Sequence, residues 1–221
     1  MPLIPSSPPL RAEIALHSAT WRSHLLRGEV VAVEAHAPIG GAGLHLALPH
    51  PVYALGTDSI VARRAISAAR RTGWRALVDK GGEVIAATEV SRRRAGSYGG
   101  AVNRGRFVAA TVTHVLRLEE ELADKQEDFE VRLLRVPAIC VVALWLHVRR
   151  SHPGHDVIVP LADVGPLNVR RSHPGHDVIV PLTDVGPLAE GRQLSPTEFL
   201  DLIRPLALDR FSDAPDEPVP G

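Results

Sequence analysis

The most constraining feature of the sequence is a block of twenty residues that occurs twice in tandem. Residues 148–167 read "VRRSHPGHDVIVPLADVGPL", and residues 169–188 repeat them with one difference, Ala162 against Thr183. Two segments with one apolar pattern cannot both lie beside the same neighbouring strand, so the copies must have different surroundings. Repeat folds need three or more units to bury a continuous core. The duplication is therefore a local addition to some other fold.

Each copy contains a turn followed by a strand. In His-Pro-Gly-His the proline and glycine hold the second and third positions of a type II β-turn, and the following "DVIVPL" has the composition of a strand. In the first copy, this turn predicts a hairpin that joins an apolar strand ending near Val148 to residues 156–161. We expect the duplication to add an extra hairpin or edge strand, with Pro160 and Pro181 limiting further pairing. Deletion of residues 148–168 should leave a folded chain.

The repeated turns also supply side chains that could bind a metal. Zinc and nickel both accept imidazole and carboxylate ligands. The candidate ligands are His152, His155, Asp156, His173, His176 and Asp177. Known zinc motifs place paired histidines at helical or finger spacing, and His-Pro-Gly-His has neither. We favour an exposed turn and predict no cofactor, with a zinc or nickel site as the alternative.

Length and composition indicate one compact domain. A chain of 221 residues with 45% hydrophobic content can bury a sizeable core. We assign residues 1–10 to a flexible leader rich in proline and serine, residues 11–211 to a single domain that includes both copies of the repeat, and residues 212–221 to a disordered acidic tail. The leader lacks the pattern of a signal peptide.

Charge and cysteine content bear on location and partners. The 25 basic and 25 acidic residues balance, so no net field attracts nucleic acid or an anionic membrane. The longest apolar run, residues 136–148, is shorter than the roughly twenty residues that span a bilayer. Cys140 lies within this run, where we expect a buried thiol, and a single cysteine forms no internal disulfide. These features predict a soluble, cytoplasmic protein.

Periodicity predicts the order of helices and strands. Helical spacing marks residues 14–28, 57–73 and 107–125, and alternation marks strands at 29–37, 44–48 and 128–135, a hairpin at 74–90, and a strand buried on both sides within 136–148. A last helix begins after Ser195, with Glu198 completing a capping box and Leu194 packing on Phe199. Pro205 should kink or end it. The order predicts an α+β fold, with a mainly antiparallel sheet and about four helices packed mostly on one face.

An arginine-rich segment is a candidate anion site. Residues 91–106 show neither helical nor strand periodicity and predict a mobile loop. Its arginines could bind a phosphate or carboxylate group; they are Arg92, Arg93, Arg94, Arg104 and Arg106. Only Tyr98 could stack on a base, and Lys80 and Lys125 are the only lysines among 25 basic residues, so arginine is abundant throughout the chain. We favour a solvated loop over an anion site.

No motif fixes a reaction. The chain has no G-x-S-x-G nucleophile motif, phosphate-binding loop or dinucleotide fingerprint. The sequence therefore favours a non-enzymatic domain that binds a protein or a small ligand. A metal-dependent hydrolase using the paired His-Pro-Gly-His turns, and anion binding through the arginine-rich loop, are the alternatives. Nucleic acid and membrane are disfavoured as partners, and an acidic segment at residues 119–130 leaves self-association open.

Overall fold

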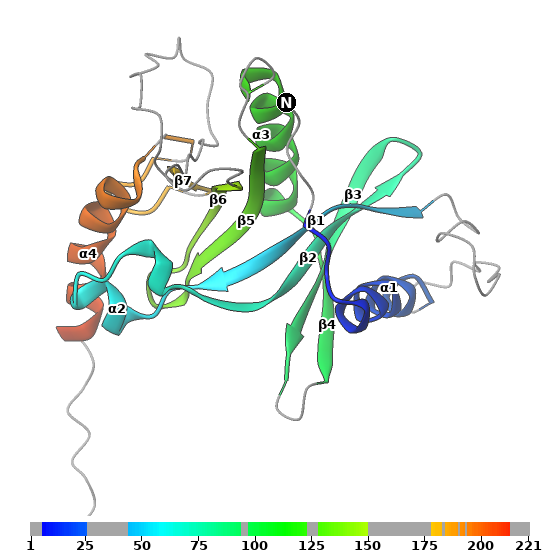
Figure 1. Cartoon of the computed structure of the whole chain (residues 1–221), viewed down its shortest axis with the longest axis horizontal. Helices are drawn as coiled ribbons and strands as arrows, with labels where there is room; N and C mark the ends of the chain where they lie inside the picture. Colours follow the sequence, from blue (N-terminus) through cyan, green and yellow to red (C-terminus); the bar gives the residue numbers. More distant parts are fainter. Residues whose placement is uncertain are drawn as a thin grey trace, which may run out of the picture.

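The described residues form one mixed sheet of seven strands in the order β4-β3-β2-β1-β5-β6-β7 (Figure 1). The computed structural model describes residues 6–25, 44–93, 97–122, 128–149, 178–182, 184–189, 191–192 and 194–212. The strands are β1 (Leu44–Ala54), β2 (Arg70–Lys80), β3 (Glu83–Arg92), β4 (Tyr98–Asn103), β5 (Asp128–Val136), β6 (Val141–Arg149) and β7 (Val178–Pro181). Only β1 and β5 pair in parallel. The predicted α+β class and mainly antiparallel sheet are confirmed.

Four α-helices accompany the sheet in the described residues: α1 (Leu10–Leu25), α2 (Thr57–Val61), α3 (Arg106–Leu122) and α4 (Pro196–Ser212). Along β2, successive side chains point to opposite faces of the sheet. Trp74 and Ala76 pack with α1 on one face of the sheet. Leu77 points to the other face, where it packs with Val108 of α3. Helices α1 and α3 thus cover opposite faces of the same central strands. None of the described helices is long and apolar enough to cross a membrane.

Two local predictions are confirmed in detail. The hairpin at residues 74–90 is formed by β2 and β3, and Gly81 and Gly82 between them have φ of 64° and 90°. Positive φ at both positions suits a tight hairpin turn and favours glycine. Helix α4 begins with a capping box, in which the Ser195 N–H donates to Glu198 Oε2 at 2.8 Å and the Glu198 N–H donates to Ser195 Oγ at 3.2 Å. The helix continues past Pro205 to Ser212.

The predicted helix at residues 57–73 is wrong. Helix α2 ends at Val61, a single 3-10 turn η1 (Ile66–Ala68) follows, and β2 begins at Arg70. Arg70 and Arg71, which fall within the predicted helix, pair instead with β1. Gly73 is not a helix cap: an added Cβ there would lie 2.0 Å from the backbone oxygen of Val90, so glycine permits β2 to pair with β3.

The buried position predicted for Cys140 is also wrong, because this residue is exposed. Pro137 ends β5 and begins a 3-10 turn, η3 (Pro137–Ile139), and Cys140 follows in the left-handed conformation with φ of 54°. Strand β6 therefore starts only at Val141. From there the prediction is confirmed, since consecutive residues of β6 are buried on both faces of the sheet: Ala143, Leu144, Trp145 and Leu146.

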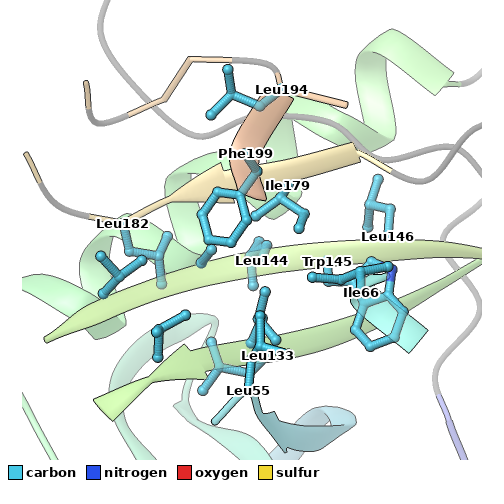
Figure 2. Packing of buried hydrophobic residues seen from close by; sticks show 14 of the residues in the cluster. Leu55, Ile66, Leu133, Leu144, Trp145, Leu146, Ile179, Leu182, Leu194 and Phe199 are labelled. Atoms are coloured by element: carbon cyan, nitrogen blue, oxygen red, sulfur yellow. The ribbon is translucent and has the colours of Figure 1, made fainter. Parts of the chain in front are cut away.

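The second copy of the repeat contributes to the main core. Strand β7 pairs with β6 between Ala143 and Leu146, and Ile179, Leu182 and Leu188 are buried with Phe199 of α4 (Figure 2). Most of the first copy lies outside the described residues, as do both His-Pro-Gly-His turns. The expected strand at 29–37, residues 1–5 of the leader and residues 213–221 of the tail also lie outside them.

Candidate functional site

The structure separates the arginines that the sequence grouped as an anion site. The predicted mobile loop at residues 91–106 contains the end of β3, the whole of strand β4 and the first residue of α3, which corrects that interpretation. Arg92 and Arg93 lie at one end of β4, next to its hairpin turn, and Arg104 and Arg106 lie at the other end, where α3 begins. Six residues of strand span roughly 20 Å, so the two pairs cannot hold one small anion. Arg94 lies outside the described residues.

The six predicted metal ligands, His152, His155, Asp156, His173, His176 and Asp177, all lie outside the described residues. Within the residues that are described, no group of three or more histidine, cysteine, aspartate or glutamate side chains is arranged to hold a metal ion. The metal hypothesis therefore depends on residues for which the structure gives no geometry.

A pocket of about 410 Å³ opens between α1 and the start of the sheet. We call it the α1–β1 pocket. Its lining comes from the N-terminal segment, from α1, and from β1 and β2: Ser6, Ser7, Pro8, Glu13, Leu16, His17, His45, Leu46, Pro49 and Ala76. The volume falls within the range of small-molecule sites in proteins.

A bulge in β1 shapes the floor of the α1–β1 pocket. The register between β1 and β2 shifts between Ala47 and His50, so Leu48 and Pro49 lie together opposite Ala76. Leu48 has a φ of 45°, which bends the strand. Pro49 and Ala76 both line the pocket. β-Bulges are common beside binding sites because they redirect the strand and its side chains.

The N-terminal segment is fixed to the sheet at this bulge. The backbone N–H of Ser6 donates to the carbonyl oxygen of Pro49 at 3.1 Å, and the hydroxyl of Ser6 donates to Oε1 of Glu130 on β5. The other carboxylate oxygen of Glu130 accepts two bonds from Arg132. Arg132 in turn lies over the ring of Trp145, 4.6 Å from its centroid. The wall of the pocket is therefore held by a buried polar chain and not by apolar contacts alone.

The pocket joins an apolar floor to a polar rim. Leu16 and Ala76 are buried, whereas Ser7, Glu13 and His45 are exposed around the opening. Among the described residues that line the pocket, Glu13 is the only one with a formal charge when the imidazoles are counted as neutral. The site therefore suits a ligand with an apolar body and a donor group, such as an ammonium or a hydroxyl, and disfavours an anion.

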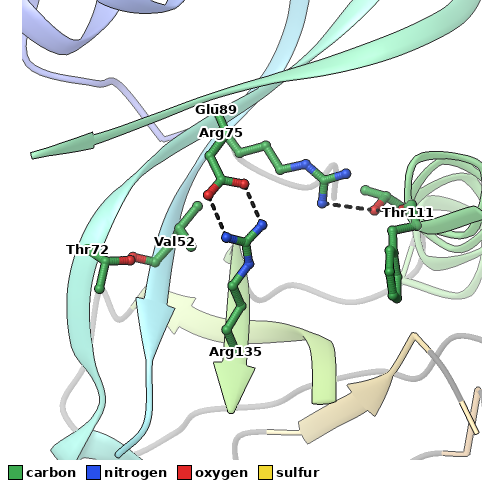
Figure 3. A network of polar contacts seen from close by, with 7 residues as sticks. Val52, Thr72, Arg75, Glu89, Thr111 and Arg135 are labelled. Atoms are coloured by element: carbon green, nitrogen blue, oxygen red, sulfur yellow. Dashed lines mark hydrogen bonds and ion pairs between the residues drawn. The ribbon is translucent and has the colours of Figure 1, made fainter. Parts of the chain in front are cut away.

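A second polar cluster lies on the opposite face, beneath α3 (Figure 3). Arg135 of β5 forms a two-bond ion pair with Glu89 of β3, with distances of 2.6 and 2.5 Å. Arg75 of β2 is buried, and its Nη1 lies 3.5 Å from Oγ1 of Thr111 on α3. Burial lowers the pKa of Arg75 to about 10; Glu89 opposes this shift and Arg135 adds to it. Arg75 thus stays charged at neutral pH.

Two buried histidines, His50 beside Arg75 and His114 on α3, are held neutral. Burial, and then the charge of Arg75, lower the pKa of His50 to about 3. Its Nδ1 donates to the carbonyl oxygen of Leu48 at 2.7 Å, which leaves Nε2 as a buried acceptor without a partner. Burial, and then Arg117, lower the pKa of His114 on α3 to about 2. Both pKa values are lowered mainly because the imidazoles are buried.

Sequence reasoning did not identify the α1–β1 pocket. Its lining residues come from four segments between Ser6 and Ala76 and form no spaced motif. One signal in the sequence could have indicated the site: Glu13 and His17 lie one helical turn apart, so both side chains share one side of α1. Comparison of the chain with protein-family models, with curated proteins and with solved structures found no match.

Proposed function

We propose that the chain is a non-enzymatic binding domain, and that its α1–β1 pocket holds a small organic molecule with an apolar body and a cationic or hydroxyl end. The observation that carries the proposal is the described lining of the pocket, an apolar floor bordered by hydroxyls and imidazoles, in which Glu13 is the only described residue with a formal charge. A cytoplasmic location, expected from the single cysteine, is part of this proposal.

Binding is favoured over catalysis because the described residues of the pocket include no paired nucleophile and base. The hydroxyl of Ser6 is bonded to Glu130, and in the described structure neither His17 nor His45 is hydrogen-bonded to a serine of the pocket. A serine nucleophile requires an adjacent base within hydrogen-bonding reach. The metal-dependent hydrolase remains the alternative, and it rests on the repeated turns alone.

The decisive experiment compares two ligands with the same apolar body and opposite charge. Phenethylamine and phenylacetate each carry one benzene ring, and at roughly 0.3–0.5 kcal/mol per non-hydrogen atom we expect a dissociation constant for the amine of the order of 1–10 mM. Binding is measured from backbone NMR shifts of the full chain. We expect phenethylamine to shift the amides of Ser7, His17 and Leu46, and phenylacetate to shift them at least fivefold more weakly.

Two variants with matched controls locate the binding. Ser7→Trp places a large side chain at the opening and should abolish the shifts, whereas Ser67→Trp, at an exposed site on η1, should leave them unchanged. Glu13→Gln should remove the preference for the amine, and Glu83→Gln, at an exposed site on β3, should not. Equal binding of the two ligands to the wild-type chain, or shifts that survive Ser7→Trp, would overturn the proposal.

A further inference from the structure

Strand β4 is a sheet edge without the usual protection. In the described structure β4 pairs only with β3, in a register without a bulge. Proteins commonly block such edges with proline, lysine or a bulge, and "YGGAVN" contains none of these. The opposite edge is protected, because β7 contains Pro181 and its Ile179 bridges to Leu194. The two edges of one sheet therefore differ in their capacity to accept another strand.

The register shows which backbone groups of β4 point outward. The Arg93 N–H donates to the carbonyl oxygen of Ser97 at 2.7 Å, and hydrogen-bonded pairs alternate along an antiparallel ladder. The bonds of alternate residues therefore point toward β3: Gly99, Ala101 and Asn103. The remaining residues present their N–H and C=O groups to the free edge: Tyr98, Gly100 and Val102.

Helix α1 holds this edge in place. A Cβ added to Gly100 would lie 2.5 Å from Cβ of Ala19, so glycine allows α1 to pack directly on the backbone of β4. Tyr98 packs in the same apolar cluster as Leu16 and Trp74. A strand that is already ordered loses little conformational entropy when it binds a partner. The free edge is thus pre-organised for strand addition.

Basic side chains flank the free edge at both ends. Arg92 and Arg93 precede β4, Arg104 and Arg106 follow it, and all four are exposed. None of the four forms an ion pair within the described residues. Glu89, the only acidic residue of β3 that lies opposite β4, is bonded to Arg135. The edge therefore presents about 20 Å of strand between two positive ends.

We propose that β4 binds an extended acidic peptide segment of a partner protein by strand addition. Backbone hydrogen bonds to Tyr98, Gly100 and Val102 would hold the peptide, and carboxylates toward both of its ends would contact the arginine pairs. Added strands obtain affinity from backbone bonds and specificity from side chains. No residue of β4 is among the described residues that line the α1–β1 pocket, so the inference is independent of that pocket.

The test uses the full chain and a fluorescein-labelled peptide, Asp-Asp-Val-Thr-Val-Thr-Val-Asp-Asp, with binding followed by fluorescence anisotropy. A second peptide replaces each aspartate with lysine. A third keeps the aspartates but carries N-methyl groups on its five central residues, which removes backbone donors and preserves charge. We expect the first peptide to bind, the lysine peptide to show no binding, and the N-methylated peptide to bind at least tenfold more weakly.

Charge reversal at each end tests the arginines separately. Arg92→Glu with Arg93→Glu, and Arg104→Glu with Arg106→Glu, should each weaken binding of the first peptide about tenfold at low salt. The matched control is Arg64→Glu with Arg210→Glu, two exposed arginines outside β4, for which we expect less than a twofold change.

Three results would overturn the proposal. Equal binding of the N-methylated peptide would show attraction of any polyanion, including nucleic acid, and not strand addition. Self-association of the wild-type chain that the arginine reversals abolish, measured by sedimentation, would show that a second copy occupies the edge. Absence of binding of the first peptide at millimolar concentration would exclude an acidic peptide as the occupant.

Discussion

The polar groups on one face of the central strands are buried, and those on the other face are exposed to solvent. On the α3 face, Arg75 and His50 are buried among packed side chains, and Glu89 is held by Arg135. On the α1 face, Glu13 and His45 are exposed and border a pocket of about 410 Å³. Both faces belong to the same strands, and they differ in whether a ligand can reach the polar groups.

This difference bears on how sites are recognised. Strongly shifted pKa values often mark functional sites, but buried ion-pair networks produce them too. Among the described residues, the groups with shifted pKa values are His50, Arg75 and His114, and burial is the largest cause of each shift. The groups that a ligand can contact lie on the α1 face. We infer that the α3 cluster stabilises the fold and that the α1 face is available for binding.

The largest expected effect is that of Glu89→Gln. The substitution leaves Arg75 and Arg135 without their neighbouring carboxylate on the α3 face. Removal of one partner from a buried pair typically costs 3–5 kcal/mol, and because the side chain of Arg135 is 36% exposed we expect the lower end, about 3 kcal/mol. Urea unfolding at pH 7 measures the loss.

Glu121→Gln is the matched control. Glu121 pairs with Arg117 one turn away on the exposed side of α3, and exposed pairs of this kind contribute at most about 0.5 kcal/mol. If the two substitutions cost the same, the α3 cluster is not a buried network and the contrast between the faces fails.

The next effect is a loss of stability in acid. Because the pKa of His50 in the folded chain is about 3, below its ordinary value of 6.5, the unfolded chain binds more protons between these values. Stability is therefore complete above pH 6.5 and decreases as the pH falls toward 3. His114 acts in the same direction. Linkage gives about 2 kcal/mol for each histidine between pH 7 and pH 5.

His50→Asn tests this directly, since its amide can replace the Nδ1 donor to the carbonyl of Leu48 without a titrating group. The variant should lose about 2 kcal/mol less than the wild type between pH 7 and pH 5 in urea unfolding. His45→Asn, at an exposed position near the start of β1, is the control. A pH dependence unchanged by His50→Asn would show that His50 is not the acid-sensitive group.

The sequence predicted those elements whose signals are local. The capping box at Ser195, the glycine turn at Gly81 and the strand β5 are each predicted from a few neighbouring residues, and each is found in the structure. The burial along β5 does not alternate, however, because Glu130 and Leu134 are buried as well. Such signals act through backbone geometry and the burial of one face, which a short window of sequence contains.

The remaining features depend on contacts between distant segments. Nothing near Arg70 indicates that β1 will pair with it, and so the segment was interpreted as a helix. The sequence predicts one loop for the arginine pairs because "YGGAVN" has no strand-like alternation. Of its two glycines, Gly100 permits the close approach of α1, and Gly99 leaves room for the side chain of Arg93. The α1–β1 pocket likewise requires Ser6 to reach Glu130, 124 residues away along the chain.

A smaller effect is expected for Thr111→Val. The hydroxyl of Thr111 lies within 3.5 Å of Arg75 and donates to the carbonyl of Phe107. The substitution keeps the volume and leaves Nη1 of Arg75 without this acceptor, which should cost about 1 kcal/mol. Thr113→Val, on the exposed side of the same helix, controls for the change in helix propensity. A cost below about 0.3 kcal/mol would show that Arg75 does not depend on α3.

The smallest effect is expected for Glu13→Gln, the counterpart of Glu89→Gln on the open face. Glu13 lies in the first turn of α1, where a negative charge interacts favourably with the helix dipole. Its side chain borders the pocket and is exposed to water, so its neutralisation should cost only about 0.3–0.5 kcal/mol in urea unfolding. The loss of unfolding free energy caused by a Glu→Gln substitution would then be roughly six times larger, or more, for Glu89 than for Glu13. The reason is that solvent reaches Glu13, whereas packed side chains enclose Glu89. A loss above about 1.5 kcal/mol would place Glu13 in a buried pair, and the α1–β1 pocket would then have no free charge with which to select a ligand.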